Sequence, residues 1–154
     1  HEADAPDAFD AVAHACGSGG TAAGVALGAR RFEVAPQTLA MAVCDDRAYF
    51  DAAIARIVEE ARAYLGAAAE PGDLRVVDAF KGPAYGVASA EQKSFVVQVA
   101  RATGLILDPV YTGKALFALA RMPEKPARVP KLLYILMTTT LTQWVHVLAK
   151  KEQE

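Results

Sequence analysis

The sequence predicts a three-layer α/β fold with a mainly parallel β-sheet. Short apolar runs alternate with longer segments of helical spacing, and this order is typical of strands joined by crossover helices. The apolar runs are continuous, as at residues 11–16 and 38–44, which is expected of strands covered by helices on both faces. Glycine-rich loops follow these runs, and parallel sheets bind ligands at the carboxyl ends of their strands.

Composition limits the classes of function. The 154 residues suffice for one domain with a core, and 53% are hydrophobic. A formal net charge of −2 gives no electrostatic reason to expect a nucleic-acid or anionic-membrane partner, and no apolar run reaches membrane-spanning length. We predict no metal site. Cys16 and Cys44 lie in apolar runs, so we expect reduced core thiols and a cytoplasmic protein.

The first half of the chain predicts two strands and two helices. A strand at residues 11–16 leads through a glycine loop to a helix of small residues at 22–29. The apolar run at 38–44 is a second strand, and Asp45 or Asp46 is placed to cap the helix that follows. The apolar positions of that helix keep helical spacing: Phe50, Ile54, Ile57, Ala61 and Leu65.

The second half continues the alternation. Residues 74–80 predict a strand, and residues 81–87 a glycine-containing loop. Ser89 and Gln92 form a near capping box at the start of a helix that Gly104 ends. The short apolar run 105–107 is interpreted as a strand that leads into residues 108–114, and a helix follows at 115–121. A surface loop at 123–130, a last strand at 131–137 and a terminal helix at 141–151 complete the prediction.

The loop Gly17-Ser18-Gly19-Gly20-Thr21 (hereafter the glycine loop) has the features of an anion site. Glycines allow successive N–H groups to point the same way, the helix dipole adds positive charge, and Ser18 and Thr21 add hydroxyl donors. A tight turn without a ligand is the simpler alternative. The run also satisfies the dinucleotide pattern G-x-G-x-x-G/A, although Gln37 stands where an acidic residue is wanted.

Two further loops accompany the glycine loop, Gly82-Pro83-Ala84-Tyr85-Gly86 and Asp108-Pro109-Val110-Tyr111-Thr112-Gly113-Lys114. The three motifs together resemble the D-cysteine desulfhydrase and 1-aminocyclopropane-1-carboxylate deaminase family. These are pyridoxal-phosphate enzymes of fold type II, the fold of the tryptophan synthase β chain. The resemblance implies that residues 1–135 are the C-terminal part of the catalytic domain. Residues 136–154 are a divergent tail, since the family's His-Thr-Gly-Gly is replaced here by residues 136–139, Leu-Met-Thr-Thr.

The resemblance also implies roles for individual residues. The glycine loop (Gly17, Ser18, Gly19, Gly20 and Thr21) would bind the phosphate of pyridoxal 5'-phosphate, and Thr112 would lie near the pyridine nitrogen of that cofactor. Tyr85 and Tyr111 would flank the substrate as catalytic residues, with the Asp108-Pro109 turn aiming Tyr111. We expect Lys114 to be solvated or to steer phosphate, and His14 to be a satisfied core histidine.

The implied activity of the parent enzyme is β-elimination from D-cysteine to pyruvate, sulfide and ammonia, or deamination of the cyclopropane amino acid. Its partner would be a small amino-acid substrate, and the parent would be a homodimer. The family's Schiff-base lysine lies in an N-terminal segment, and neither Lys81 nor Lys114 matches it. The chain opens on His1 without a methionine, so we expect a fragment that is inactive alone. A dinucleotide-binding oxidoreductase domain and a non-catalytic phosphate-binding module are the alternatives.

Overall fold

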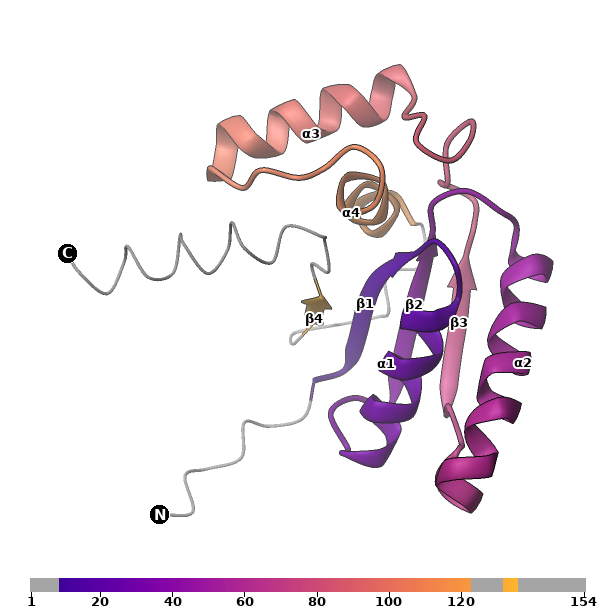
Figure 1. Cartoon of the computed structure of the whole chain (residues 1–154). Coiled ribbons are helices and arrows are strands. Elements are labelled where there is room, and N and C mark those ends of the chain that lie inside the picture. Colours follow the sequence, from indigo (N-terminus) through magenta and orange to yellow (C-terminus); the bar gives the residue numbers. More distant parts are fainter. Residues whose placement is uncertain (1–8, 123–131, 136–154) are drawn as a thin grey trace, which may run out of the picture.

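The structure, a computed structural model, describes residues 9–122 and 132–135, and contains a four-stranded sheet in the order β3-β2-β1-β4 (Figure 1). All three strand pairs are parallel, with Ala11 opposite both Gln37 and Leu132. The elements in chain order are β1 (Ala11–Cys16), α1 (Gly20–Arg31), β2 (Gln37–Ala42), α2 (Arg47–Leu65), a 3-10 turn (Gly66–Ala68), β3 (Asp73–Val77), α3 (Ala90–Thr103), α4 (Thr112–Arg121) and β4 (Leu132–Ile135).

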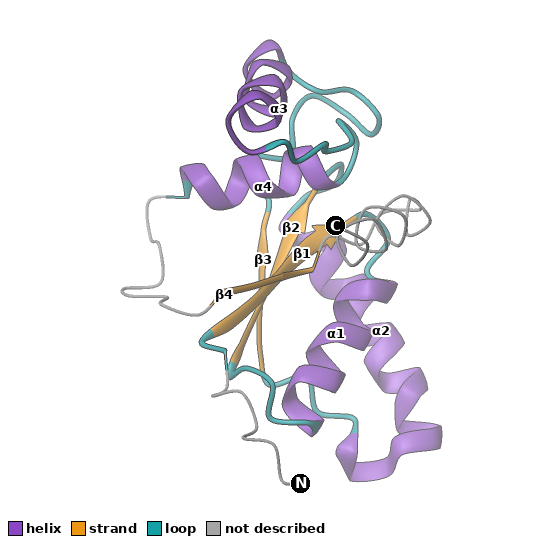
Figure 2. Ribbon diagram, turned by 90° about the vertical axis from the view of Figure 1, so that its left-hand side faces the viewer, coloured by secondary structure: helices purple, strands orange, loops and turns teal. Residues whose placement is uncertain are grey.

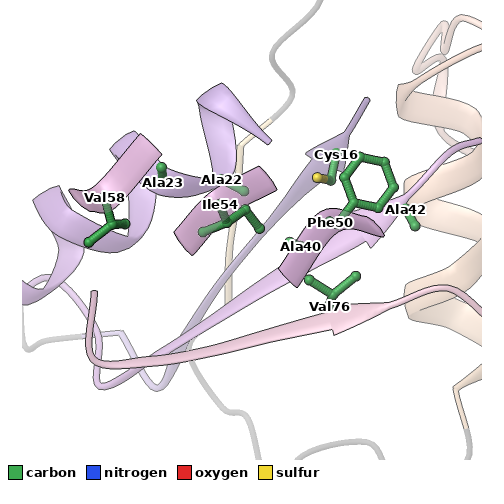
Figure 3. Close-up of a cluster of buried hydrophobic side chains, with 9 residues drawn as sticks. All are labelled: Cys16, Ala22, Ala23, Ala40, Ala42, Phe50, Ile54, Val58 and Val76. Carbon is green, nitrogen blue, oxygen red and sulfur yellow. The ribbon is translucent and has the colours of Figure 1, made fainter. Parts of the chain in front are cut away.

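Helices α1 and α2 cover one face of the sheet (Figure 2). The core on this face is built around Phe50 and Ile54 of α2, which lie over small residues of the strands and of α1 (Figure 3). Ala22 and Ala23 are fully buried there, so the small side chains of α1 allow the helix to approach the sheet closely. The remaining buried members of this cluster are Cys16, Ala40, Ala42, Val58 and Val76.

Helix α4 covers the opposite face. Ala115, Ala118 and Met122 pack against strand residues that alternate with those of the first cluster, among them Ala13 and Met41. Helix α3 packs on α4, where the rings of Phe95 and Phe117 meet edge to face at 5.5 Å. Helices therefore cover both faces of a parallel sheet, and the predicted three-layer α/β fold is confirmed.

Local sequence signals fix several helix ends as predicted. The Asp46 carboxylate accepts the Tyr49 N–H at 2.8 Å and caps α2. Ser89 and Gln92 form a complete capping box at α3, with both reciprocal hydrogen bonds present. Gly104 ends α3 with a φ of 75°, a conformation that glycine adopts without strain.

The interpretation of residues 105–107 as a strand is wrong. They form no strand, and the Ile106 side chain is 81% exposed. Helices α3 and α4 pack on each other directly, so the segment between them passes outside the sheet. The motif at residues 108–114 consequently opens α4 instead of following a strand. The surface loop at 123–130 and the predicted tail at 136–154 lie outside the described residues.

The chain path singles out the carboxyl end of β1. From β1 the chain passes to β2 and then β3, through helices on one face of the sheet. Strand β4 pairs with the other edge of β1, and the chain reaches it after α4, which covers the opposite face. The direction of strand addition thus reverses beside β1, and α/β sheets bind ligands at such switch points. The glycine loop directly follows β1 (Figure 1). Across the part of the chain that the structure describes, no helix is long and apolar enough to cross a membrane.

Candidate active site

The glycine loop presents exposed donors at the start of α1. Gly19 is buried with a φ of 86°, and a Cβ atom there would lie 3.4 Å from Cγ1 of Ile54, so this position requires glycine. Ser18, Gly20 and Thr21 are exposed. Among the described residues, no side chain caps the first turn of α1, whose leading N–H groups have no carbonyl four residues earlier within the helix. These N–H groups and two hydroxyls are therefore available to an anion.

Tyr111 lies directly against this loop. A Cβ atom on Gly17 would lie 2.8 Å from Cε1 of the Tyr111 ring, closer than side-chain carbons normally approach. Gly17 thus needs its glycine because of the ring. The contact joins the carboxyl end of β1 to the residue that precedes α4, although the two residues are far apart in the sequence.

Tyr85 and Tyr111 form a pair (hereafter the tyrosine pair). Their hydroxyl oxygens are 2.5 Å apart, and their rings meet edge to face with centroids 5.9 Å apart. The hydrogen bond with Tyr85, followed by burial, raises the pKa of Tyr111 to about 12. The Tyr111 phenol consequently keeps its proton near neutral pH. Tyr85 is 59% exposed, so the pair reaches from the loop out to solvent.

A tight turn carries Tyr85. The Val87 N–H donates to the Ala84 carbonyl at 3.1 Å, and Gly86 supplies the positive φ of 71° that the turn needs. The ends of the loop are fixed by the buried side chain of Gln92, which donates to the Phe80 carbonyl at 2.8 Å and accepts the Ser89 N–H at 2.8 Å. The turn is therefore held to the start of α3.

Asp108 orients Tyr111. Its carboxylate accepts the backbone N–H groups of Val110, Tyr111 and Thr112 at 2.9, 2.6 and 3.0 Å. Burial alone would raise the pKa of Asp108, but the hydrogen bonds from the Thr112 side chain and from these N–H groups together hold the pKa below its usual value. The ionised carboxylate thus caps the first turn of α4, in agreement with the structural role expected for Asp108.

The Thr112 hydroxyl already has partners within the chain. It donates to the Asp108 carboxylate and accepts the Asp108 N–H at 3.0 Å, and the residue is 2% exposed. Its predicted place near the pyridine nitrogen stays a prediction. The next residue, Gly113, leaves no room for a side chain, because a Cβ atom there would lie 2.7 Å from the Asp108 carbonyl oxygen and 2.6 Å from a Val96 methyl group.

The expectation that Lys114 is solvated is wrong. The residue is 1% exposed, and its ammonium donates to the carbonyls of Val43 at 2.8 Å and Ala84 at 2.7 Å. Burial lowers the pKa of this ammonium. Sequence reasoning missed the contact; its one signal was a lysine three residues after Tyr111, on the same side of α4.

Cys44 and His14 differ in part from the core thiol and the satisfied core histidine that the sequence predicts. Cys44 is only half-buried, and its thiol donates to the Gly17 carbonyl at 3.6 Å; burial raises its pKa. His14 is fully buried, as expected, and its Nδ1–H donates to the Ala15 carbonyl at 3.0 Å. It is not satisfied, however, because Nε2 has no hydrogen-bond partner in the structure, as far as it is described. Burial lowers the pKa of His14.

The chain is similar in sequence to known proteins. A bifunctional D-cysteine desulfhydrase/1-aminocyclopropane-1-carboxylate deaminase from Arabidopsis thaliana is 39% identical over 111 residues, which are 72% of this chain and 27% of the relative. A D-cysteine desulfhydrase from Yersinia enterocolitica is 35% identical over 113 residues, 72% of this chain and 34% of the relative. The chain therefore spans about a third of the length of these relatives.

A solved structure and a family model agree with these similarities. The crystal structure of an ACC deaminase homologue superposes with a TM-score of 0.73 at 28% identity, covering 96% of this chain and 46% of the other. The family model of pyridoxal-phosphate dependent enzymes matches residues 1–135. This match takes in the glycine loop, the tyrosine pair and every described strand, and the chain thus belongs to the family of pyridoxal-phosphate dependent enzymes.

Proposed function

We propose that this chain supplies the phosphate-binding loop and the substrate-facing tyrosines of an enzyme that eliminates sulfide from D-cysteine. The observation that carries the proposal is the contact between Tyr111 and Gly17, which puts a protonated phenol beside the anion-binding loop. A phosphate-bearing cofactor and the reacting part of a small substrate would then meet at the same strand end.

The residues present fit the phosphate of pyridoxal 5'-phosphate. The leading N–H groups of α1 have no capping side chain among the described residues, and Ser18 and Thr21 carry exposed hydroxyls beside them. A phosphate dianion accepts hydrogen bonds from such donors and gains from the helix dipole. When bound, the cofactor supplies the electron sink that makes the α-hydrogen of an amino acid acidic. The family assignment favours this cofactor over the dinucleotide alternative.

The tyrosine pair would act on the substrate by donating hydrogen bonds. A phenol with a pKa of about 12 is a donor and a weak acid near neutral pH, and it is not a base. Tyr111 would hold the substrate carboxylate or protonate the departing thiolate, and the exposed Tyr85 would exchange protons with solvent. Elimination of this kind gives pyruvate, hydrogen sulfide and ammonia from D-cysteine and water.

Two arguments favour D-cysteine over 1-aminocyclopropane-1-carboxylate, which is the alternative substrate. Thr112 stands where deaminase-type sequences of the resembled family carry an acidic residue, and a hydroxyl strengthens the electron sink less than a carboxylate does. Expulsion of a thiol is also easier than opening an unactivated ring. In a full-length parent we expect a higher kcat/KM for sulfide release from D-cysteine than for 2-oxobutyrate formation. A preference for the cyclopropane amino acid would overturn the substrate assignment.

Two further parts of the proposal concern the whole protein. We infer a cytoplasmic location, for which the two free thiols are the support. We also propose that the parent is a homodimer, as the family resemblance implies.

The cofactor assignment is tested by titrating the 154-residue chain with pyridoxal 5'-phosphate, inorganic phosphate, pyridoxal and NAD. We expect the first two to shift the amide signals of residues 17–21 in NMR spectra, and pyridoxal to leave them unchanged. Shifts with NAD alone would favour the dinucleotide alternative. Shifts with phosphate but no response of the Tyr85 and Tyr111 rings to pyridoxal 5'-phosphate would favour a phosphate-binding module without catalytic function.

A further inference from the structure

The ammonium group of Lys114 joins two segments of the chain beneath the site. It donates to the Val43 carbonyl at 2.8 Å and to the Ala84 carbonyl at 2.7 Å, and the side chain is 1% exposed. A buried charge is costly unless polar groups compensate for it. Here two carbonyl dipoles offset the cost, one from the residue that follows β2 and one from the loop between β3 and α3.

Both carbonyls belong to segments that shape the candidate site. The Ala84 carbonyl closes the turn that carries Tyr85, since it also accepts the Val87 N–H at 3.1 Å. Val43 bonds to the last residue before the glycine loop, because its N–H donates to the Cys16 carbonyl at 3.1 Å.

Lys114 itself follows Tyr111 by three residues, and positions three apart share a face of a helix. One side chain therefore connects the helix of Tyr111 with the turn of Tyr85. The other contacts that fix this loop, those of Gln92, act at its ends, at Phe80 and Ser89. Besides the hydrogen bond of the tyrosine pair itself, Lys114 reaches the turn from the side of Tyr111, through the Ala84 carbonyl.

We propose that Lys114 is a positioning residue that sets the hydrogen bond between Tyr85 and Tyr111, by holding the Ala84 carbonyl to α4. The relevance of this bond to catalysis rests on the function proposed above, but the bond itself is measurable without cofactor or substrate. Lys114 acts by positioning the turn that carries Tyr85, and not by an electrostatic effect of its charge on the pKa of the Tyr111 phenol. The pKa of Tyr111 is raised by the hydrogen bond with Tyr85, by burial and by the charges of Tyr85, Cys44 and Asp108, and the charge of Lys114 is not among these causes.

The test compares Lys114→Met with Lys93→Met in the 154-residue chain labelled at tyrosine. Methionine keeps the apolar stem of lysine and removes its donors, and the exposed Lys93 of α3 provides the matched control. In Lys114→Met we expect loss of the ring-to-ring nuclear Overhauser effect between Tyr85 and Tyr111. We also expect the pKa of Tyr111, followed by the carbon signal next to its hydroxyl, to fall by at least about one unit from about 12 toward the ordinary value of 10.0. Lys93→Met should change neither quantity.

A Tyr85→Phe background separates positioning from a direct effect. Tyr85→Phe should lower the pKa of Tyr111 by itself, and adding Lys114→Met should then lower it no further. A folded Lys114→Met protein with an intact ring contact would overturn the proposal, and so would an equal effect of Lys114→Met in the Tyr85→Phe background.

Two controls complete the design. If circular dichroism shows that Lys114→Met is unfolded, Lys114→Gln, which retains one donor group, is measured in its place; failure of both to fold would assign Lys114 to overall stability and overturn the proposal. Titration with pyridoxal 5'-phosphate is carried out in parallel. If Lys114→Met loses the contact between the two tyrosine rings while the unaltered chain binds no cofactor, the proposed function is refuted. The positioning role of Lys114 then stands.

Discussion

Replacing Gly17 with alanine tests the contact on which the candidate site depends. The added Cβ atom would lie 2.8 Å from Cε1 of Tyr111, so the ring must withdraw by about 0.7 Å to reach the ordinary carbon–carbon distance of about 3.5 Å. Overpacking of this kind costs about 1–3 kcal/mol, and the lower half of that range applies because the contacted atom is on a ring that can turn. The midpoint of thermal unfolding should fall by roughly 2–8 °C.

The matched control is Gly24→Ala in the middle of α1. Apart from the backbone of its own helix and its chain neighbours, no atom of the described residues lies within 4 Å of the Cβ position at Gly24. Alanine is also the better helix former by about 1 kcal/mol, so this change should raise the midpoint. Withdrawal of the ring in Gly17→Ala should also weaken the bond to Tyr85 and lower the pKa of Tyr111. Circular dichroism gives the unfolding midpoints, and NMR gives the ring signals. An unchanged midpoint with unmoved Tyr111 signals would refute the inferred contact between the loop and the ring.

Three more predictions concern His14, Asp108 and Lys114. His14 has a lowered pKa in the folded chain, so the unfolded chain takes up a proton there at a higher pH than the folded chain does. The free energy of unfolding should therefore fall as the pH drops below 6.5, by up to about 1.4 kcal/mol per pH unit. His14→Leu should flatten the dependence of the unfolding midpoint on pH. Asp108→Asn removes the charge that caps α4 and should cost about 1–3 kcal/mol in denaturant unfolding. The deficit should shrink as the pH falls below the ordinary carboxyl value of 3.8, because the stabilisation from a lowered pKa is lost from there downward; a constant deficit across the pH range would contradict this. Borohydride reduction in the presence of pyridoxal phosphate should leave Lys114 unlabelled in mass spectra because its ammonium is buried between two carbonyls, and stoichiometric labelling there would contradict the structure.

The sequence was sufficient where a feature depends on neighbours along the chain. Asp46 caps α2 and Ser89 pairs with Gln92 because the partner of each side chain lies three residues away. The continuous apolar runs correctly indicated strands covered on both faces. Gly17 and Tyr111 lie in motifs that are visible in the sequence, whereas the contact between them is not.

Features that depend on distant partners were missed. The burial of Lys114 requires carbonyls that are 71 and 30 residues away in the sequence, and no local pattern encodes them. Residues 105–107 have the apolar composition of a strand, but the packing of α3 on α4 leaves them no place in the sheet. His14 was expected to be satisfied because buried polar atoms nearly always are, and its Nε2 atom is an exception to that rule.

The position of β4 has a consequence for how the chain folds. The pairing of β1 with β2 joins positions 11 and 37, whereas the pairing of β1 with β4 joins positions 11 and 132. Closing the longer loop costs roughly 1.4 kcal/mol more in chain entropy, because this cost grows with the logarithm of loop length. The unit from β1 to β3 can therefore assemble while α4 and β4 are still unfolded. During that interval β1 is an open edge, able to pair with a strand of another chain, and the half of the site that carries Tyr111 is added to a glycine loop that is already in place.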